Sequence, residues 1–186
     1  MAEMNRWREN EETMAFLVAL DISGFSRYMT EPDQLLDHRM RFFKAVERTT
    51  LIPIARQLGT VVVHFLGDEL RLAFQNSVGG REVYKFIDDV QAVLENENRE
   101  VVTERRTRVK GTVFKGVVTW KTWQKCTFLD GSLPFKAQRW MAELQAGEIA
   151  MDAAFKLDLA LTAVLPYEPM PRAFGDETGY LLWGGV

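Results

Sequence analysis

The sequence predicts an α+β sandwich with the ferredoxin-like element order βαββαβ and additional elements at the C-terminus. Three observations predict this class. Strand-like apolar runs alternate with helical periodicity in that order, residues 61–74 contain two apolar strands joined by a two-residue turn, and no repeat or low-complexity linker interrupts the chain. With 186 residues, 47% of them hydrophobic, the chain can form one core. We therefore expect a polar N-terminal segment at residues 1–14 and a single domain over residues 15–186.

The first half of the chain is expected to supply a strand, a helix and a hairpin. The apolar run AFLVALD at residues 15–21 predicts the first strand, and residues 23–29 predict a short helical turn. Proline favours the first turn of a helix, so the apolar periodicity that follows it predicts one long helix over residues 32–58. The hairpin VVVHFLGDELRLAF then occupies residues 61–74.

The second half is expected to add a helix and a strand before the C-terminal additions. Glycine at positions 79 and 80 precedes the helix, whose apolar residues recur at helical spacing as far as Leu94. The elements expected after it are a charged loop at 95–108, an extended segment at 109–120, an irregular region, a helix at 134–144, a short strand at 147–152, a helical turn, and closing strands near 160–168 and 179–184.

The composition excludes several classes of protein. A formal net charge of -3 provides no basic surface for a nucleic-acid partner. Cys126 is the only cysteine, so it forms no internal disulfide and builds no zinc site alone. This cysteine usage is typical of a reducing, cytoplasmic setting. No apolar run approaches the length of a membrane span, so we expect a soluble protein with no membrane partner.

Two acidic residues stand at positions that the predicted topology brings together. Asp21 ends the first strand, and Asp68 lies in the hairpin turn, where Gly-Asp is also an ordinary turn sequence. Two carboxylates in close approach repel each other unless a cation lies between them. Oxygen ligands of this kind suit Mg²⁺ or Mn²⁺. The sequence therefore predicts a divalent metal site at Asp21 and Asp68, with the Ile22 carbonyl as a further ligand.

The residues after this aspartate predict a phosphate site beside the metal. Ser23, Gly24 and Phe25 open a helical turn, and backbone N–H groups at a helix N-terminus bind phosphate. Magnesium commonly completes its coordination with substrate phosphates. Metal and phosphate together indicate nucleotide chemistry.

Two stretches carry a resemblance to a known enzyme family. DISGFS at residues 21–26 and FLGDELRLAF at residues 65–74 resemble the two metal motifs of class III nucleotide cyclases. The likeness extends to KAQRW at residues 136–140 and PRAFGDETGYLLW at residues 171–183, and it covers most of residues 15–183. The resemblance implies the class III cyclase form of the predicted fold and a phosphorus-oxygen lyase activity.

The resemblance also implies roles for particular residues. Asp21 and Asp68, with the Ile22 carbonyl, would bind two divalent ions per site. Arg139 stands where cyclases keep an arginine that stabilises the transition state, and Arg172 where they usually keep a lysine for the triphosphate. Because the metal ligands and the arginine come from opposite protomers in this family, the resemblance implies a homodimer with two shared sites.

The base-reading positions depart from those of purine cyclases. His64 occupies the first position, and Phe128 or a nearby lysine, Lys121 or Lys125, occupies the second. Phe135 replaces the usual ribose-orienting asparagine. Neither the adenine pair nor the guanine pair of the family is present, and removal of hydrogen-bonding partners removes base specificity. The departures disfavour an ordinary adenylate or guanylate cyclase.

A small chain with intact metal ligands and a changed base pocket is similar to the stand-alone pyrimidine cyclases of bacterial Pycsar antiphage defence. This resemblance implies conversion of UTP to 3′,5′-cyclic UMP and pyrophosphate, and a separate effector protein that the cyclic nucleotide activates. Uracil is favoured because it presents two carbonyl acceptors to His64 and a nearby lysine or arginine. Three alternatives stay open: a cytidylate cyclase making cyclic CMP, a purine cyclase with an atypical pocket, and a cyclase-fold protein that binds nucleotide without turning it over.

Two further polar residues have two interpretations each. Arg71 lies within an apolar strand, where its guanidinium either reaches phosphate or base or extends to the sheet edge. Glu69 either tunes the metal site or is a solvent-exposed turn carboxylate.

Overall fold

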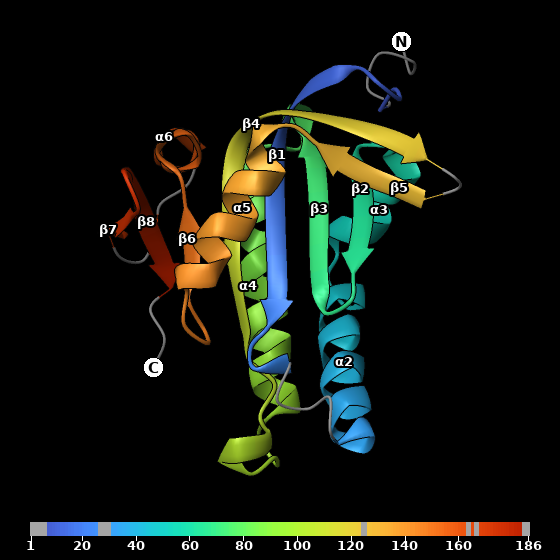
Figure 1. Ribbon diagram of the computed structural model, residues 1–186, viewed down its shortest axis with the longest axis vertical. Helices are drawn as coiled ribbons and strands as arrows, with labels where there is room; N and C mark the ends of the chain where they lie inside the picture. Colours follow the sequence, from blue (N-terminus) through green and yellow to red (C-terminus); the bar gives the residue numbers. More distant parts are fainter. Residues whose placement is uncertain (1–6, 26–30, 124–125, 163–164, 166–167, 184–186) are drawn as a thin grey trace.

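The computed structural model describes residues 7–25, 31–123, 126–162, 165 and 168–183. One sheet runs through this part of the chain (Figure 1). Its eight described strands are β1 (Glu12–Ile22), β2 (Val61–Leu66), β3 (Glu69–Gln75), β4 (Val109–Trp123), β5 (Cys126–Asp130), β6 (Ile149–Met151), β7 (Met170–Phe174) and β8 (Glu177–Trp183). Their order across the sheet is β2-β3-β1-β4-β6-β8-β7, and β5 pairs with β4 outside this path.

The central four strands form the predicted core. β2, β3, β1 and β4 are neighbours in antiparallel pairs, which is the order expected when βαββαβ folds into one sheet. β6 adds to β4 in parallel, and the β7–β8 hairpin extends the sheet beyond it. The predicted α+β sandwich with C-terminal additions is therefore confirmed.

Helices cover both faces of the sheet. Those in the described part of the chain are α2 (Pro32–Glu47), α3 (Leu51–Leu58), α4 (Gly80–Glu97), α5 (Ser132–Glu143) and α6 (Ala153–Thr162). Figure 1 shows α5 in front of the sheet and α4 behind it. β1 serves both layers, because Phe16 and Val18 join the core under α2 and α4 whereas Leu17 and Ala19 join the core under α5. None of the described helices is long and apolar enough to cross a membrane.

The single long helix expected over residues 32–58 is two helices. α2 ends at Glu47, and α3 begins at Leu51. Pro53 lies in the first turn of α3, where its missing N–H leaves no helical bond unmade. In a continuous helix the ring of Pro53 would clash with the carbonyl of Thr49, four residues earlier. Apolar periodicity spans the break without revealing it, so the prediction was wrong here.

Three expectations for the second half also need correction. The irregular region after residue 120 is in fact the end of β4 and the strand β5, which form a hairpin arm. The expected helical turn after residue 152 is the ten-residue helix α6. The strand expected near residues 160–168 is absent from the described part of that range. Its place beside β8 is taken by β7, because the turn at Gly175 lets MPRAF pair with the last strand.

Candidate functional site

Asp21 and Asp68 meet at one end of the sheet. Asp21 lies near the end of β1, opposite Glu69 of β3 and Lys110 of β4. Asp68 follows Gly67 in the turn between β2 and β3, and Gly67 has a φ of 67°, which glycine adopts without strain. Asp68 lies close enough to Asp21 to raise the pKa of the Asp21 carboxyl group. Two carboxylates in such close approach repel each other when no cation lies between them.

The surroundings of Asp21 oppose its negative charge. Burial is the largest cause that raises its pKa from 3.8 to about 7, and the charge of Asp68 is the second. Lys110 acts in the opposite direction, with Nζ 3.7 Å from Asp21 Oδ2. A divalent cation would offset the repulsion between the two carboxylates, so this donor set fits Mg²⁺ or Mn²⁺.

The carboxylate pair would hold such an ion only in part. Among the described residues, no group of three or more acidic, histidine or cysteine side chains is placed to hold a metal. Magnesium sites at substrate phosphates use one or two carboxylates and take their other ligands from water and substrate. The pair therefore suits an ion that arrives with a phosphorylated substrate.

We expect the free energy of unfolding of the metal-free protein to fall as pH rises from about 4 to about 7. The folded protein keeps the proton on Asp21 up to a pKa of about 7, whereas the unfolded chain releases it near 3.8, so ionisation favours unfolding. The expected contribution is on the order of 1–3 kcal/mol, since water reaches part of the side chain and screens its charge. Urea titrations of the wild type and Asp21→Asn across this range measure the effect. A difference between the two proteins that does not change with pH would contradict the account.

The strand registers place further polar side chains beside the pair. Two adjacent cross-strand rows run through Leu66, Glu69, Asp21 and Lys110, and through His64, Arg71, Ala19 and Thr112. Alternate residues of a strand share a face, and Ala19 places both rows on the face that also carries α5. The threonine hydroxyl in the second row is buried without a hydrogen-bond partner among the described residues. The two rows form a polar floor, and we keep this name for them.

Arg71 and Glu69 form an ion pair within the polar floor. Arg71 is 8% exposed and donates through Nε and Nη2 to the two Glu69 oxygens, at 2.5 and 3.1 Å. The side chain of Glu69 is itself largely buried, so its interpretation as an exposed turn carboxylate was wrong. Arg71 likewise turns along its own inner strand instead of extending to the sheet edge.

His64 lies directly across β2 and β3 from this arginine. Its Nδ1 is buried and finds no hydrogen-bond partner in the described part of the chain. Burial lowers the pKa of His64, and Arg71 lowers it further against the opposing effect of Glu69. The imidazole is therefore neutral at pH 7, with one ring nitrogen as a donor and the other as an acceptor.

The predicted phosphate loop is described only at its start. The Ser23 N–H donates to the Arg108 carbonyl at 2.9 Å, so this amide is committed to the fold and the prediction needs correction there. Its Oγ is buried with no described partner. Gly24, with a φ of 78°, and Phe25, the first helical residue, leave the sheet beside Asp21. Residues 26–30 lie outside the described residues.

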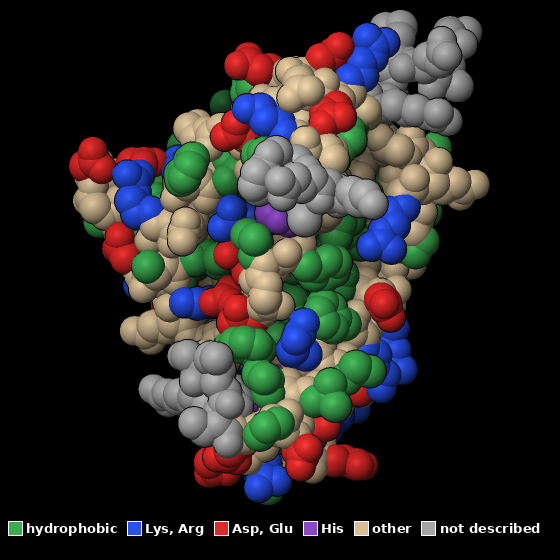
Figure 2. Space-filling model, turned by 45° about the vertical axis from the view of Figure 1, so that its right-hand side comes forward, with side chains coloured by type: hydrophobic (Ala, Val, Ile, Leu, Met, Phe, Trp, Pro, Cys, Tyr) green, Lys and Arg blue, Asp and Glu red, His purple; other side chains and the backbone are tan. Residues whose placement is uncertain are grey.

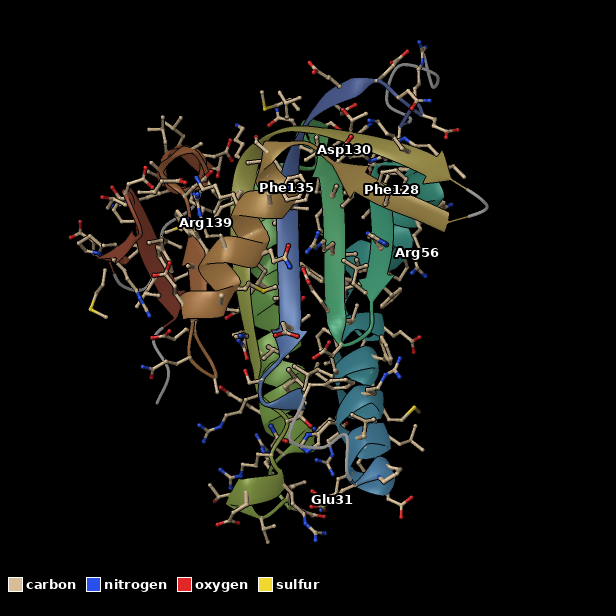
Figure 3. The ribbon with its side chains drawn as sticks, in the orientation of Figure 1. Glu31, Arg56, Phe128, Asp130, Phe135 and Arg139 are labelled. Carbon is tan, nitrogen blue, oxygen red and sulfur yellow. The ribbon has the colours of Figure 1, made fainter. Side chains whose placement is uncertain are left out.

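Arg139 lies away from the carboxylate pair within one protomer. It projects from α5 and pairs with Glu177 of β8, and Lys136 Nζ lies 2.7 Å from the other oxygen of Glu177. Figure 3 shows Arg139 on the side of α5 that faces the C-terminal strands. More than half of its side chain is exposed. One chain alone does not bring Arg139 to Asp21 and Asp68.

Arg172 is engaged inside the protomer. It lies on β7 and donates to Glu148 Oε2 and to the Glu143 carbonyl, both at 2.6 Å. Glu148 is buried, so Arg172 neutralises a charge that would otherwise be uncompensated. Both terminal nitrogens of Arg172 thus have partners, and a role with triphosphate would require them to be shared or released.

The predicted base-reading residues are dispersed. Phe128 lies on β5 opposite Lys121, whose Nζ pairs with Asp130. Figure 3 shows Phe128 on the hairpin arm and Phe135 on α5. Phe135 is 70% exposed, so its ring is available to a partner. Lys125 lies outside the described residues.

A separate cavity of about 650 Å³ contains none of these residues. It lies between the C-terminal half of α4, the loop around residues 98–109 and the turn at 146–147. Acidic and basic side chains both line it, and Asn98 closes one wall by exchanging two hydrogen bonds with Thr107. The polar floor, not this cavity, carries the paired carboxylates.

Solved cyclase structures superpose on most of the chain. A bacterial light-regulated adenylyl cyclase matches 93% of this chain and 52% of its own, with a TM-score of 0.72 and 16% identity. The guanylate cyclase domain of RhGC from Catenaria anguillulae, in complex with GTP, matches 92% of this chain and 97% of its own, with a TM-score of 0.66 and 15% identity. The chain has the fold of nucleotide cyclase domains. No protein-family model and no curated protein matches its sequence.

Within this cyclase fold, the sequence did not indicate that Lys110 lies beside Asp21 or that Arg71 and Glu69 form an ion pair. Lys110 is the second residue of β4, and only the antiparallel register with β1 places it opposite Asp21. The alternation of Glu69 and Arg71 between apolar residues was the available signal, because it places both on one strand face beside Asp68.

Proposed function

We propose that this protein is a nucleotidyl cyclase that converts UTP to 3′,5′-cyclic UMP and pyrophosphate. The observation that carries the proposal is the close approach of Asp21 and Asp68 at the end of a cyclase-type sheet. Two partly buried carboxylates in close approach form an unfavourable arrangement without a cation. Their position beside Gly24 and Phe25 supports a site where metal and phosphate bind together.

Two divalent ions, Mn²⁺ or Mg²⁺, would be held by Asp21, Asp68 and the Ile22 carbonyl. When bound, such ions stabilise the charge of the triphosphate and lower the pKa of the ribose 3′-hydroxyl. The chain's own groups orient the nucleotide: Gly24 and Phe25 offer backbone donors to phosphate, and Lys110 adds a positive charge next to Asp21. The 3′-hydroxyl releases its proton to solvent as its oxygen attacks the α-phosphorus in line. The new bond closes the 3′,5′-cyclic ring, the bond from the α-phosphorus to the bridging oxygen breaks, and pyrophosphate leaves.

A second copy of the chain would complete each site. Arg139 points away from the carboxylate pair in its own protomer, and an arginine that stabilises the α-phosphate must approach it. Phe65 and Leu66 are 47% and 41% exposed just before the Asp68 turn. Figure 2 shows hydrophobic side chains gathered between charged ones on one face of the protein. The guanylyl cyclase domain of the RhoGC fusion protein from Blastocladiella emersonii, which shares this fold, has been crystallised both as a non-canonical dimer and as a monomer.

The base preference rests on the polar floor. His64 occupies the position where a purine cyclase would keep a charged or polar residue that binds the base, and its Nδ1 has no described hydrogen-bond partner. Its neutral imidazole carries one donor and one acceptor, which suits a base edge that has both acceptors and a donor. Uracil presents such an edge. A cyclic pyrimidine nucleotide would act as a signal for a separate effector protein in antiphage defence, as the resemblance implies.

The test is product analysis. Purified protein is incubated with equal concentrations of ATP, GTP, CTP and UTP and with Mn²⁺, and the products are identified by mass spectrometry. We expect cyclic UMP and pyrophosphate in equal amounts as the main products, and their loss on addition of EDTA. Cyclic CMP, cyclic AMP or cyclic GMP as the main product would contradict the uracil assignment, and no cyclic nucleotide would contradict the enzyme assignment.

A further inference from the structure

We propose that Arg71 determines base specificity by donating hydrogen bonds to a base carbonyl, so that the site selects uracil over cytosine. The inference rests on the proposed function, because it deepens the substrate class of the same site. It is carried by the placement and the hydrogen bonding of Arg71, which lies in the row of the polar floor that also contains His64.

Arg71 has unused hydrogen-bond donors in a buried position. A guanidinium carries five N–H groups, and two of those of Arg71 donate to Glu69. Glu69 is its one hydrogen-bond partner among the residues that the structure describes. Nη1 of Arg71 is not among the fully buried polar atoms that lack a partner, so its N–H groups are accessible to solvent or to a ligand.

Glu69 fixes the direction of those donors. Its two oxygens bind Nε and Nη2, which is the side-on arrangement that holds the guanidinium plane in one orientation. This leaves the Nη1 end for a ligand. The neighbour of Arg71 on β1 is Ala19, a buried core residue. The carboxylate is therefore a positioning residue for Arg71.

Arg71 and His64, the two residues proposed to bind the base, offer different hydrogen-bonding groups. Arg71 offers donors only, whereas neutral His64 offers one donor and one acceptor. Uracil carries a carbonyl oxygen at position 4, which accepts from Arg71, and an N3–H, which donates to His64. Cytosine carries an amino group at position 4. If this group faces Arg71, two hydrogen-bond donors meet and no hydrogen bond forms. Adenine has the same mismatch, so the arrangement selects a base with a carbonyl on this edge.

The experiment compares products from equal UTP and CTP with Mn²⁺ for the wild type and Arg71→Met. We expect the wild type to favour cyclic UMP, and the variant to reduce the ratio of cyclic UMP to cyclic CMP by about 10-fold or more, since a specific base contact contributes this much discrimination. The double variant Glu69→Gln with Arg71→Met removes both charges, and it should reduce the ratio of cyclic UMP to cyclic CMP by the same factor as Arg71→Met. Arg41→Met, which breaks the ion pair with the exposed Asp37 on α2, should leave the ratio unchanged.

A binding measurement separates this inference from the proposed function. Calorimetry with the 3′-deoxy forms of UTP and CTP, which lack the attacking hydroxyl, reports base selection without turnover. Tighter binding of 3′-deoxy-UTP that depends on Arg71 supports the inference even if no cyclic product forms, which would overturn only the proposed activity. Equal binding of the two analogues by the wild type overturns the inference. An unchanged product ratio in a double variant whose circular dichroism matches the wild type also overturns it.

Discussion

Replacing either aspartate of the pair, as Asp21→Asn or Asp68→Asn, is expected to lower cyclic nucleotide formation by roughly 1,000-fold or more. The amide keeps the size of the side chain but removes the negative charge that holds the metal ions. Several kcal/mol of transition-state stabilisation are then lost, and each 1.36 kcal/mol corresponds to a factor of ten in rate. Cyclic UMP formed from saturating UTP and Mn²⁺ measures the loss.

The stability of the same variants provides the control. Asp21→Asn removes a charge that burial and Asp68 oppose, so the metal-free variant should be at least as stable as the wild type at pH 8. A loss of activity in a more stable protein excludes unfolding as the cause. Near wild-type activity in either folded variant would contradict the metal site.

Arg139→Ala is expected to lower activity by roughly 100-fold to 1,000-fold, and mixing this variant with Asp21→Ala is expected to restore part of it. The single loss follows from removal of an arginine that offsets charge on the α-phosphate. Each heterodimer contains one intact site and one site with both defects, because the two residues reach each site from opposite protomers. With random assortment, the mixture should recover about one quarter of wild-type activity.

The control for this mixing experiment uses two defects on the same side of the site. Asp21→Ala mixed with Asp68→Ala leaves one of the two ligands missing at every site, so this mixture should stay inactive. If Arg139→Ala and Asp21→Ala also fail to complement each other while heterodimers form, the shared site is wrong. Size-exclusion chromatography with light scattering establishes that dimers are present.

Strand-forming segments with strong local patterns were predictable from the sequence. The apolar run that ends at Asp21 and the hairpin with Gly67 at its turn gave β1, β2 and β3 close to their observed bounds. The element order then predicted that Asp21 lies near Asp68. Both signals are local, because periodicity and turn chemistry act over a few residues.

Features that depend on tertiary pairing were not predictable. β5 exists because it pairs with the end of β4, and its own five residues have no clear alternation. The engagement of Arg172 by Glu148, and of Arg139 by Glu177, joins residues that are 24 and 38 positions apart. Side-chain partners over such separations follow from the packed fold, so the sequence alone shows the charged residues but not the pairs.

The most direct test of the central claim is the binding of Mn²⁺ to the carboxylate pair, measured by electron paramagnetic resonance of the free ion. The wild type is titrated with Mn²⁺ in the presence of 3′-deoxy-UTP and compared with the double variant Asp21→Asn with Asp68→Asn. Correction for Mn²⁺ bound by the nucleotide alone isolates the protein site. The account predicts two ions per site in the wild type and loss of protein-dependent binding in the variant. Equal Mn²⁺ binding by the two proteins, both folded, would contradict it.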